Sequence, residues 1–308
     1  MNTRPTYSTP LGPVEASPFT RGQRLRDKRT STWDTRVVPL PATFDAKTLV
    51  LPTAVASIRK AFTLAKTSRD SWVTAKREGK IDFRRAPAAS RGAQDIFKRK
   101  TGASTTHVKV SVLIDASGSM SGHDSYVSHP TVVGRKVTVT RRMAAAVFGA
   151  TIAEALGRVP TVHLDVFQHS AGGGRMYIKW RWSRGTPVAV FNQALNGIGG
   201  GGNADGHALY AITEKMRREI KRGERGVILV VSDGLPSMYG NGGTGDAGQA
   251  LVDAVAHARK QGYTVLAVAI DGSDQSAYYG DGVVPFTGDW NALGGTLAKH
   301  IGKALAHR

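Results

Sequence analysis

The sequence predicts an α/β fold with a doubly wound, mostly parallel central sheet. Two runs of aliphatic and β-branched residues, 107–114 and 226–231, are typical of strands buried on both faces. A third run of the same kind occupies residues 263–270. Helical patterns separate these runs, and such an alternation of strand and helix is typical of a parallel sheet with helices on both faces.

The other elements continue the alternation along the chain. Residues 137–157 have the apolar periodicity of a helix that ends at a glycine, and 161–167 alternate like a half-exposed strand. Residues 175–182 are typical of an edge strand. Further helices are expected at 187–196, 207–222, 249–261 and 290–306, a short strand at 283–286, and loops at 121–136 and 235–248.

Three segments divide the chain. Residues 1–45 are rich in Pro, Thr, Ser and Arg without apolar periodicity, which predicts an irregular basic arm. Residues 46–104 combine loosely helical apolar spacing with two basic runs, so we expect a helical basic extension. Residues 105–308 contain the predicted sheet and form the main domain.

Composition excludes several kinds of site and indicates where the protein is located. The chain has 308 residues, a formal charge of +19 and no cysteine, which excludes disulfides, zinc–thiolate sites and cysteine nucleophiles. Because no apolar run approaches the length of a membrane span and the first residues lack a signal-peptide core, we expect a cytoplasmic protein that makes no membrane contact. Residues 1–105 carry 21 Lys and Arg against 8 Asp and Glu, so the positive charge is concentrated there.

The first apolar run opens into the pattern Asp115-x-Ser117-x-Ser119. In open α/β sheets, ligands bind outside the carboxyl ends of the strands, where this carboxylate and these two hydroxyls are expected. A donor set of oxygen atoms suits Mg²⁺ or another hard divalent cation such as Mn²⁺. By itself the pattern is equally consistent with a polar turn after a strand.

Two other loops carry similar donors. The glycine-rich loop 199–206 contains Asn203 and Asp205 and leads into a helical pattern, and the run 226–231 is followed by Ser232 and Asp233. Three loops with oxygen donors at one edge of the predicted sheet favour a metal site over three unrelated turns.

These three loops, in this order, resemble the metal-ion-dependent adhesion site of the von Willebrand factor type A domain. The resemblance covers about residues 105–308 and implies a Rossmann-like fold, a bound Mg²⁺ and a role in protein interaction. The family's usual ligand in the second loop is a threonine. Asn203 occupies that position by its spacing from Gly206, whereas Asp205 offers a stronger ligand two residues later, and both stay open as ligands.

Within that superfamily the chain is most similar to the CobT-type subunit of aerobic cobaltochelatase and its relatives, some of them encoded by bacteriophages. The residues behind this resemblance are 76–82, 97–99, 113–120, 203–209 and 232–236. The resemblance implies an AAA+ ATPase partner of the CobS or MoxR type, docked through a carboxylate at the metal site. In the chelatase it also implies a third, large subunit and cobalt insertion into a corrin ring during cobalamin biosynthesis.

Features of the sequence bear on two other functions. The basic N-terminal region is consistent with a nucleic-acid-associated module. A phosphohydrolase with Asp115 as its nucleophile is less consistent, because the second carboxylate that such enzymes use as acid and base would fall at Ser117. The loop 199–206 lacks the Gly-Lys-Ser/Thr ending of a P-loop. The sequence therefore predicts an interaction subunit that is not catalytic alone.

Overall fold

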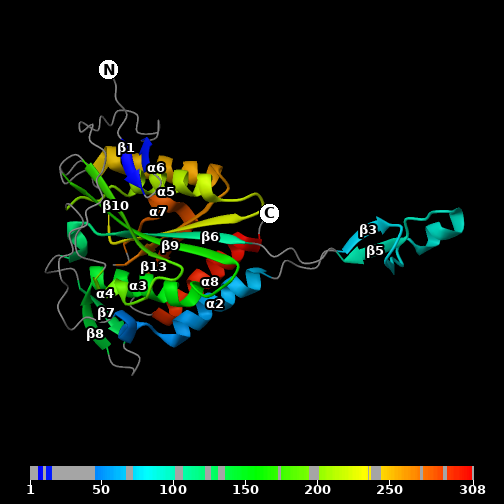
Figure 1. Ribbon diagram of the computed structural model, residues 1–308, viewed down its shortest axis with the longest axis horizontal. Helices are drawn as coiled ribbons and strands as arrows, with labels where there is room; N and C mark the ends of the chain where they lie inside the picture. Colours follow the sequence, from blue (N-terminus) through cyan, green and yellow to red (C-terminus); the bar gives the residue numbers. More distant parts are fainter. Residues whose placement is uncertain are drawn as a thin grey trace, which may run out of the picture.

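A computed structural model describes residues 6–9, 12–15, 46–66, 72–100, 107–121, 126–130, 136–172, 175–193, 201–234, 236, 244–270, 273–286 and 290–306. Its centre is a six-stranded sheet in the order β10-β9-β6-β11-β12-β13, and every neighbouring pair is parallel except β9 and β10 (Figure 1). The strands are β6 (Val108–Asp115), β9 (Val162–Gly172), β10 (Arg175–Ser183), β11 (Arg225–Ser232), β12 (Thr264–Ala269) and β13 (Val283–Pro285). The predicted doubly wound, mostly parallel sheet is confirmed.

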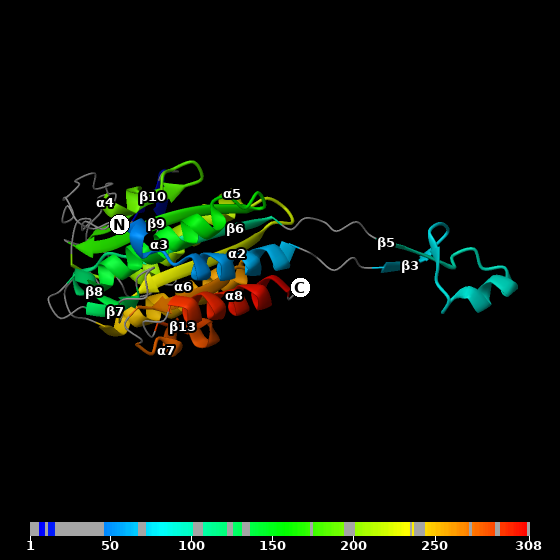
Figure 2. The ribbon, with the colours of Figure 1, turned by 90° about the horizontal axis from the view of Figure 1, so that it is seen from below.

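Helices cover both faces of this sheet (Figures 1 and 2). One face carries α2 (Pro52–Lys66), α3 (Arg141–Leu156) and α8 (Trp290–Ala306). The other carries α5 (Asp205–Glu219), α6 (Thr244–Lys260) and the short α7 (Ser276–Tyr279). A separate apolar core fills each face, which explains why β11 and β12 carry apolar side chains on both sides.

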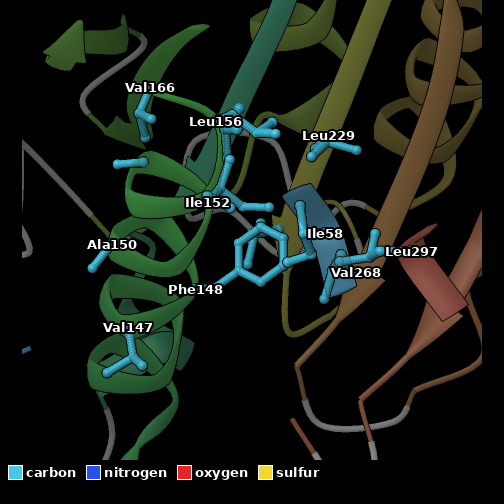
Figure 3. Packing of buried hydrophobic residues seen from close by; sticks show 14 of the residues in the cluster. Ile58, Val147, Phe148, Ala150, Ile152, Leu156, Val166, Leu229, Val268 and Leu297 are labelled. Atoms are coloured by element: carbon cyan, nitrogen blue, oxygen red, sulfur yellow. The ribbon is translucent and has the colours of Figure 1, made fainter. Parts of the chain in front are cut away.

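Figure 3 shows the first of these cores. Phe148 from α3, Ile58 from α2 and Leu297 from α8 gather beside Leu229 and Val268 of the strands. Segment 46–66, far from α8 in sequence, is therefore part of the main domain's packing rather than a separate extension. Burying a side chain of this size contributes about 1.5–3 kcal/mol.

The strand β6 shows how the sequence sets the two faces. Val108, Val110, Val112 and Ile114 belong to the core shared with α2, α3 and α8, whereas Leu113 belongs to the core under α5 and α6. Because side chains alternate along a strand, Lys109, Ser111 and Asp115 share the face of Leu113. The predicted metal ligand Asp115 and Lys109 therefore lie at opposite ends of the same face of β6.

Lys109 takes part in a buried charge cluster between the sheet and α5. Its Nζ lies 3.0 Å from Asp165 of β9 and 2.5 Å from Glu219 of α5. The Nζ of Lys215 lies 2.6 Å from Glu219 and 5.3 Å from the ring centroid of Phe167. Two lysines thus face two carboxylates, and the cluster is balanced in charge.

Three predictions of local structure were wrong. Residues 244–248, expected as the end of a loop, form the first part of α6. Residues 121–136 were expected as a loop, but β7 (Tyr126–Pro130) pairs antiparallel with β8 (Lys136–Thr140). The helix expected from 137 begins at Arg141, since the Thr140 hydroxyl accepts a hydrogen bond from the Met143 N–H at 3.1 Å and caps it. Val137 and Val139 alternate with threonines, a period of two that suits a strand.

The helical extension predicted for 46–104 is only partly correct. Helices α1 (Ala46–Leu49) and α2 are present, but residues 72–100 form a three-stranded antiparallel sheet of β3 (Trp72–Lys76), β4 (Lys80–Ile81) and β5 (Phe97–Lys100). This sheet projects from the side of the body on which β6 begins (Figures 1 and 2). Gly79, at φ +128°, makes the turn between β3 and β4.

The remaining elements are short. The part of the chain predicted as an irregular arm contains a hairpin of β1 (Thr6–Thr9) and β2 (Gly12–Glu15), and residues 16–45 lie outside the described part. Of the helix expected at 187–196, α4 (Val190–Gln193) is described. Among the described residues, no helix is both long enough and apolar enough to cross a membrane.

Gly206, the second residue of α5, allows α5 to approach α6 closely. An added Cβ would lie 2.7 Å from the carbonyl carbon of Ala250 and 2.7 Å from the backbone nitrogen of Leu251. We therefore expect Gly206→Ala to lower the free energy of unfolding, measured in urea, by about 1–3 kcal/mol. Gly295→Ala in α8 is the matched control, because a Cβ there meets nothing within 4 Å. Equal destabilisation by both changes would contradict the role of close helix contact.

Candidate metal centre

The three predicted loops meet at the carboxyl ends of β6 and β11. These two strands are neighbours at the centre of the sheet, where the strand order reverses. At such a switch point, the connections leave toward opposite faces and open a crevice. The loop after β6 carries Asp115, Ser117 and Ser119, and the loop after β11 carries Asp233.

Hydrogen bonds join the first and third loops. The Ser117 hydroxyl donates to Asp115 Oδ2 at 2.9 Å and lies 3.0 Å from the Ser119 hydroxyl. The Ser119 hydroxyl donates to Asp233 Oδ1 at 2.9 Å. Two serine hydroxyls therefore connect two carboxylates that are 118 positions apart in the sequence.

The second loop reaches the same place. Asn203 Nδ2 donates to the Ser232 hydroxyl at 3.2 Å, and that hydroxyl donates to Asp115 Oδ2 at 3.3 Å. The backbone N–H of Gly118 donates to the carbonyl of Gly201 at 3.0 Å and ties the first two loops together. All three loops thus contribute polar side chains to one network.

Asp205 is the first residue of α5 and is buried beside His169 of β9. Its Oδ1 lies 3.0 Å from His169 Nε2, the distance of an ion pair, although the two atoms are not aligned for a hydrogen bond. Burial lowers the pKa of His169, but the neighbouring Asp205 and Asp115 outweigh it and raise that pKa above 6.5. The helix N-terminus also favours a carboxylate at Asp205.

Like charges surround Asp115. Burial, together with the nearby carboxylates of Asp205 and Asp233, raises the pKa of Asp115 to about 7, against the lowering effect of His169. Asp115, Asp205 and Asp233 are all buried, whereas Ser119 is exposed. The network is therefore a crowded set of oxygen atoms with one side open to solvent.

Two arginines that the sequence analysis missed compensate part of this charge. Arg141 Nη1 donates to Asp233 Oδ2 at 2.9 Å, and Arg142 lies close enough to interact with Asp115. Both residues begin α3, where cations are disfavoured by the helix dipole. That unusual placement is the signal in the sequence from which an acidic neighbour could have been inferred.

All six predicted site residues lie in this one region: Asp115, Ser117, Ser119, Asn203, Asp205 and Asp233. Asp271, a carboxylate that follows β12 in the sequence, lies outside the described residues. Within the described ranges, no three His, Asp or Glu side chains are placed to hold a metal ion by themselves. A cation at this position would therefore depend on the serine hydroxyls.

By its fold and its site, this protein is a doubly wound α/β domain with carboxylates and hydroxyls at the switch point of the sheet. The model of the von Willebrand factor type A domain family matches residues 109–280, more than half of the chain, and the chain belongs to that family. Domains of this family serve as protein-interaction modules.

Several solved structures are similar. The von Willebrand factor domain of the type V pili tip protein Mfa5 from Porphyromonas gingivalis has 12% identity and a TM-score of 0.48, over 67% of this chain and 98% of that chain. The PilB minor pilin from Streptococcus sanguinis has 14% identity and a TM-score of 0.45, over 68% of this chain and 64% of the pilin. The pilus adhesin SpaC from Lactobacillus rhamnosus GG has 14% identity and a TM-score of 0.44, over 65% of this chain, which spans 30% of the adhesin. No curated protein matches.

Proposed function

We propose that this protein is a divalent-cation-dependent interaction module that binds a carboxylate of its partner. One observation carries the proposal: oxygen donors from three separate loops meet in one hydrogen-bonded network at the switch point of the sheet. Asp115, Ser117, Ser119 and Asp233 would hold the cation, with Asn203 or Asp205 from the second loop.

The donor set fits Mg²⁺ or Mn²⁺. Hydroxyl and carboxylate oxygens are the ligands that hard divalent cations prefer. A bound cation would also relieve the repulsion that raises the pKa of Asp115, because carboxylates that share a buried site favour a positive charge between them. When bound, the cation would supply an electrophilic position for an incoming Asp or Glu.

Asn203 and Asp205 have different surroundings, which bears on the second-loop ligand. Asp205 lies at ion-pair distance from His169 of β9, whereas Asn203 donates a hydrogen bond to Ser232 beside Asp115. We propose Asn203 as the ligand and Asp205 as a negative neighbour of the site. Asn203→Ala should then weaken Mg²⁺ binding more than Asp205→Asn does, measured by calorimetry, and the reverse order would assign the ligand to Asp205.

For the partner we propose an AAA+ ATPase of the CobS or MoxR type in the cytoplasm. The support is the resemblance of residues 113–120, 203–209 and 232–236 to CobT-type subunits, together with the lack of a P-loop in this chain. ATP hydrolysis would then belong to the partner, and this chain would supply the docking site. Participation in cobalt chelation, with a large third subunit, is the narrower form of the same proposal.

The test is copurification of this chain with the CobS- or MoxR-type ATPase of the same genome, in Mg²⁺ and in EDTA. Binding should need Mg²⁺ and be lost in Asp115→Asn, while the exposed control Asp281→Asn binds normally. Binding that ignores both EDTA and Asp115→Asn would overturn docking through the metal. Mg²⁺ binding by the chain without any ATPase binding would overturn the proposed partner alone.

Arg141 provides a separate prediction, because it competes with a cation for Asp233. Arg141→Gln removes one positive charge at the rim, and we expect Mg²⁺ to bind about 3–10-fold more tightly, since a unit charge at a partly exposed site is worth about 1 kcal/mol. Calorimetric titration gives the affinity, with the exposed Arg218→Gln as the charge-matched control. Weaker binding by Arg141→Gln would mean that Arg141 supports the site instead.

A further inference from the structure

The projecting sheet carries an unusual surface. We call residues 72–100 the projecting module. Among the described residues, the large hydrophobic side chains that are exposed are Ile81, at 42%, and Phe83, at 75%, and both belong to this module. A phenylalanine ring this exposed is not part of a core, and its face is accessible to a ligand.

The module is also strongly basic. It contains nine Lys and Arg against three Asp and Glu. Two of the three carboxylates are used internally: Asp95 pairs with Arg85 at 2.6 Å, and the buried Asp82 accepts the backbone N–H of Arg84 at 3.2 Å. The surface around Phe83 is therefore positive, with Lys80 and Arg84 exposed on either side of it in the sequence.

The backbone presents Phe83 on an ordered turn. The N–H of Asp82 donates to the carbonyl of Ile96 at 2.8 Å, and the N–H of Arg85 donates to the carbonyl of Asp82 at 2.8 Å. The first bond ties Asp82 to the residue before β5, and the second closes the turn that contains Phe83. The ring is thus held out in solvent by a fixed turn, which lowers the entropy lost when a ligand covers it.

We propose that the projecting module binds single-stranded nucleic acid, with Phe83 stacking on a base and Lys80 and Arg84 contacting phosphates. A nucleotide presents a flat apolar face and an anion together, which matches an exposed ring with exposed cations three residues before it and one residue after it in the sequence. An acidic peptide would satisfy the cations but offers no flat partner for the ring. In a duplex each base is stacked between neighbouring base pairs, which cover its faces, so a duplex should bind less well.

The experiment is fluorescence anisotropy of the full chain with a labelled 20-nucleotide oligo-dT. Phe83→Ala should weaken binding about tenfold with little change in salt dependence, because it removes stacking and no charge. Lys80→Ala/Arg84→Ala should lower the slope of log affinity against log salt by about 1.4. The exposed pair Lys221→Ala/Arg222→Ala on the main domain is the charge-matched control and should bind like wild type.

Three results would overturn this assignment. A wild-type chain that does not bind oligo-dT, or binds it no better than Phe83→Ala does, would show that the ring does not bind a base. Equal loss in the Lys221→Ala/Arg222→Ala control would indicate attraction to the whole basic chain rather than to the module. A polyglutamate peptide that binds as tightly as oligo-dT would assign the module to an acidic protein partner. Because all five substituted side chains are exposed, circular dichroism should show wild-type folding in each variant.

Discussion

Lys109→Met is expected to lower the free energy of unfolding by about 3 kcal/mol, because breaking a buried ion pair leaves an uncompensated charge in the interior. Asp165 and Glu219 would then face Lys215 as the remaining cation. Urea denaturation measures the change. Lys221→Met, at an exposed position, is the matched control and should stay within about 0.5 kcal/mol of wild type.

A second variant separates charge from packing. In Lys109→Met/Asp165→Asn the remaining Lys215 is balanced by the remaining Glu219. We therefore expect the double variant to be more stable than Lys109→Met alone. If the double variant is the less stable of the two, packing around Lys109 rather than charge balance explains the loss.

The same cluster makes stability depend on pH. Burial raises the pKa of Glu219, but hydrogen bonds from Lys109 and Lys215 outweigh it and hold the pKa below 4.5. A carboxylate with a depressed pKa stabilises the fold above its unfolded value, and this stability is lost as the pH falls through the folded pKa. Wild type should therefore lose stability below pH 4.5, and Lys109→Met should lose less over the same range in urea titrations.

Asp115→Asn is expected to abolish the stabilisation of the folded protein by Mg²⁺. At a Mg²⁺ concentration 100 times the Kd, a site present only in the folded state adds about 2.7 kcal/mol, which raises the melting temperature of wild type by about 5–10 °C. Differential scanning fluorimetry should show this shift for wild type and none for Asp115→Asn. Asp281→Asn, which alters an exposed carboxylate, should keep it.

Without Mg²⁺, Asp115→Asn should be at least as stable as wild type. Asparagine keeps the Oδ1 that accepts the Ser117 N–H, and the hydroxyls of Ser117 and Ser232 can accept from the new amide. The change also removes a charge that Asp205 and Asp233 oppose. A large loss of stability without Mg²⁺ would show that the carboxylate supports the fold itself.

The buried strands could be predicted because aliphatic and β-branched residues dominate each of them, as in β6 and β11. Segment 72–100 could not, because its short strands are mostly polar and lack a core face, so neither strand nor helix periodicity stands out. The β7–β8 hairpin was missed for a related reason: β8 runs directly into α3, and its two valines also fit the apolar pattern of that helix.

The loops of the site could be predicted because carboxyl ends of parallel strands share one edge of the sheet. The contacts of His169 and Arg141 could not, since His169 lies in the middle of β9 and Arg141 precedes Asp233 by 92 positions. Which residues lie opposite each other depends on the register between β6 and β9, where Asp115 pairs with His169. Sequence spacing carries no information on that register.

The most direct test is to count bound cations by electron paramagnetic resonance of Mn²⁺. We predict one Mn²⁺ bound per chain, displaced by Mg²⁺, and little or no binding in Asp115→Asn or Ser117→Ala/Ser119→Ala. A wild-type protein that leaves Mn²⁺ free in solution, or variants that bind it as wild type does, would contradict the proposed metal centre.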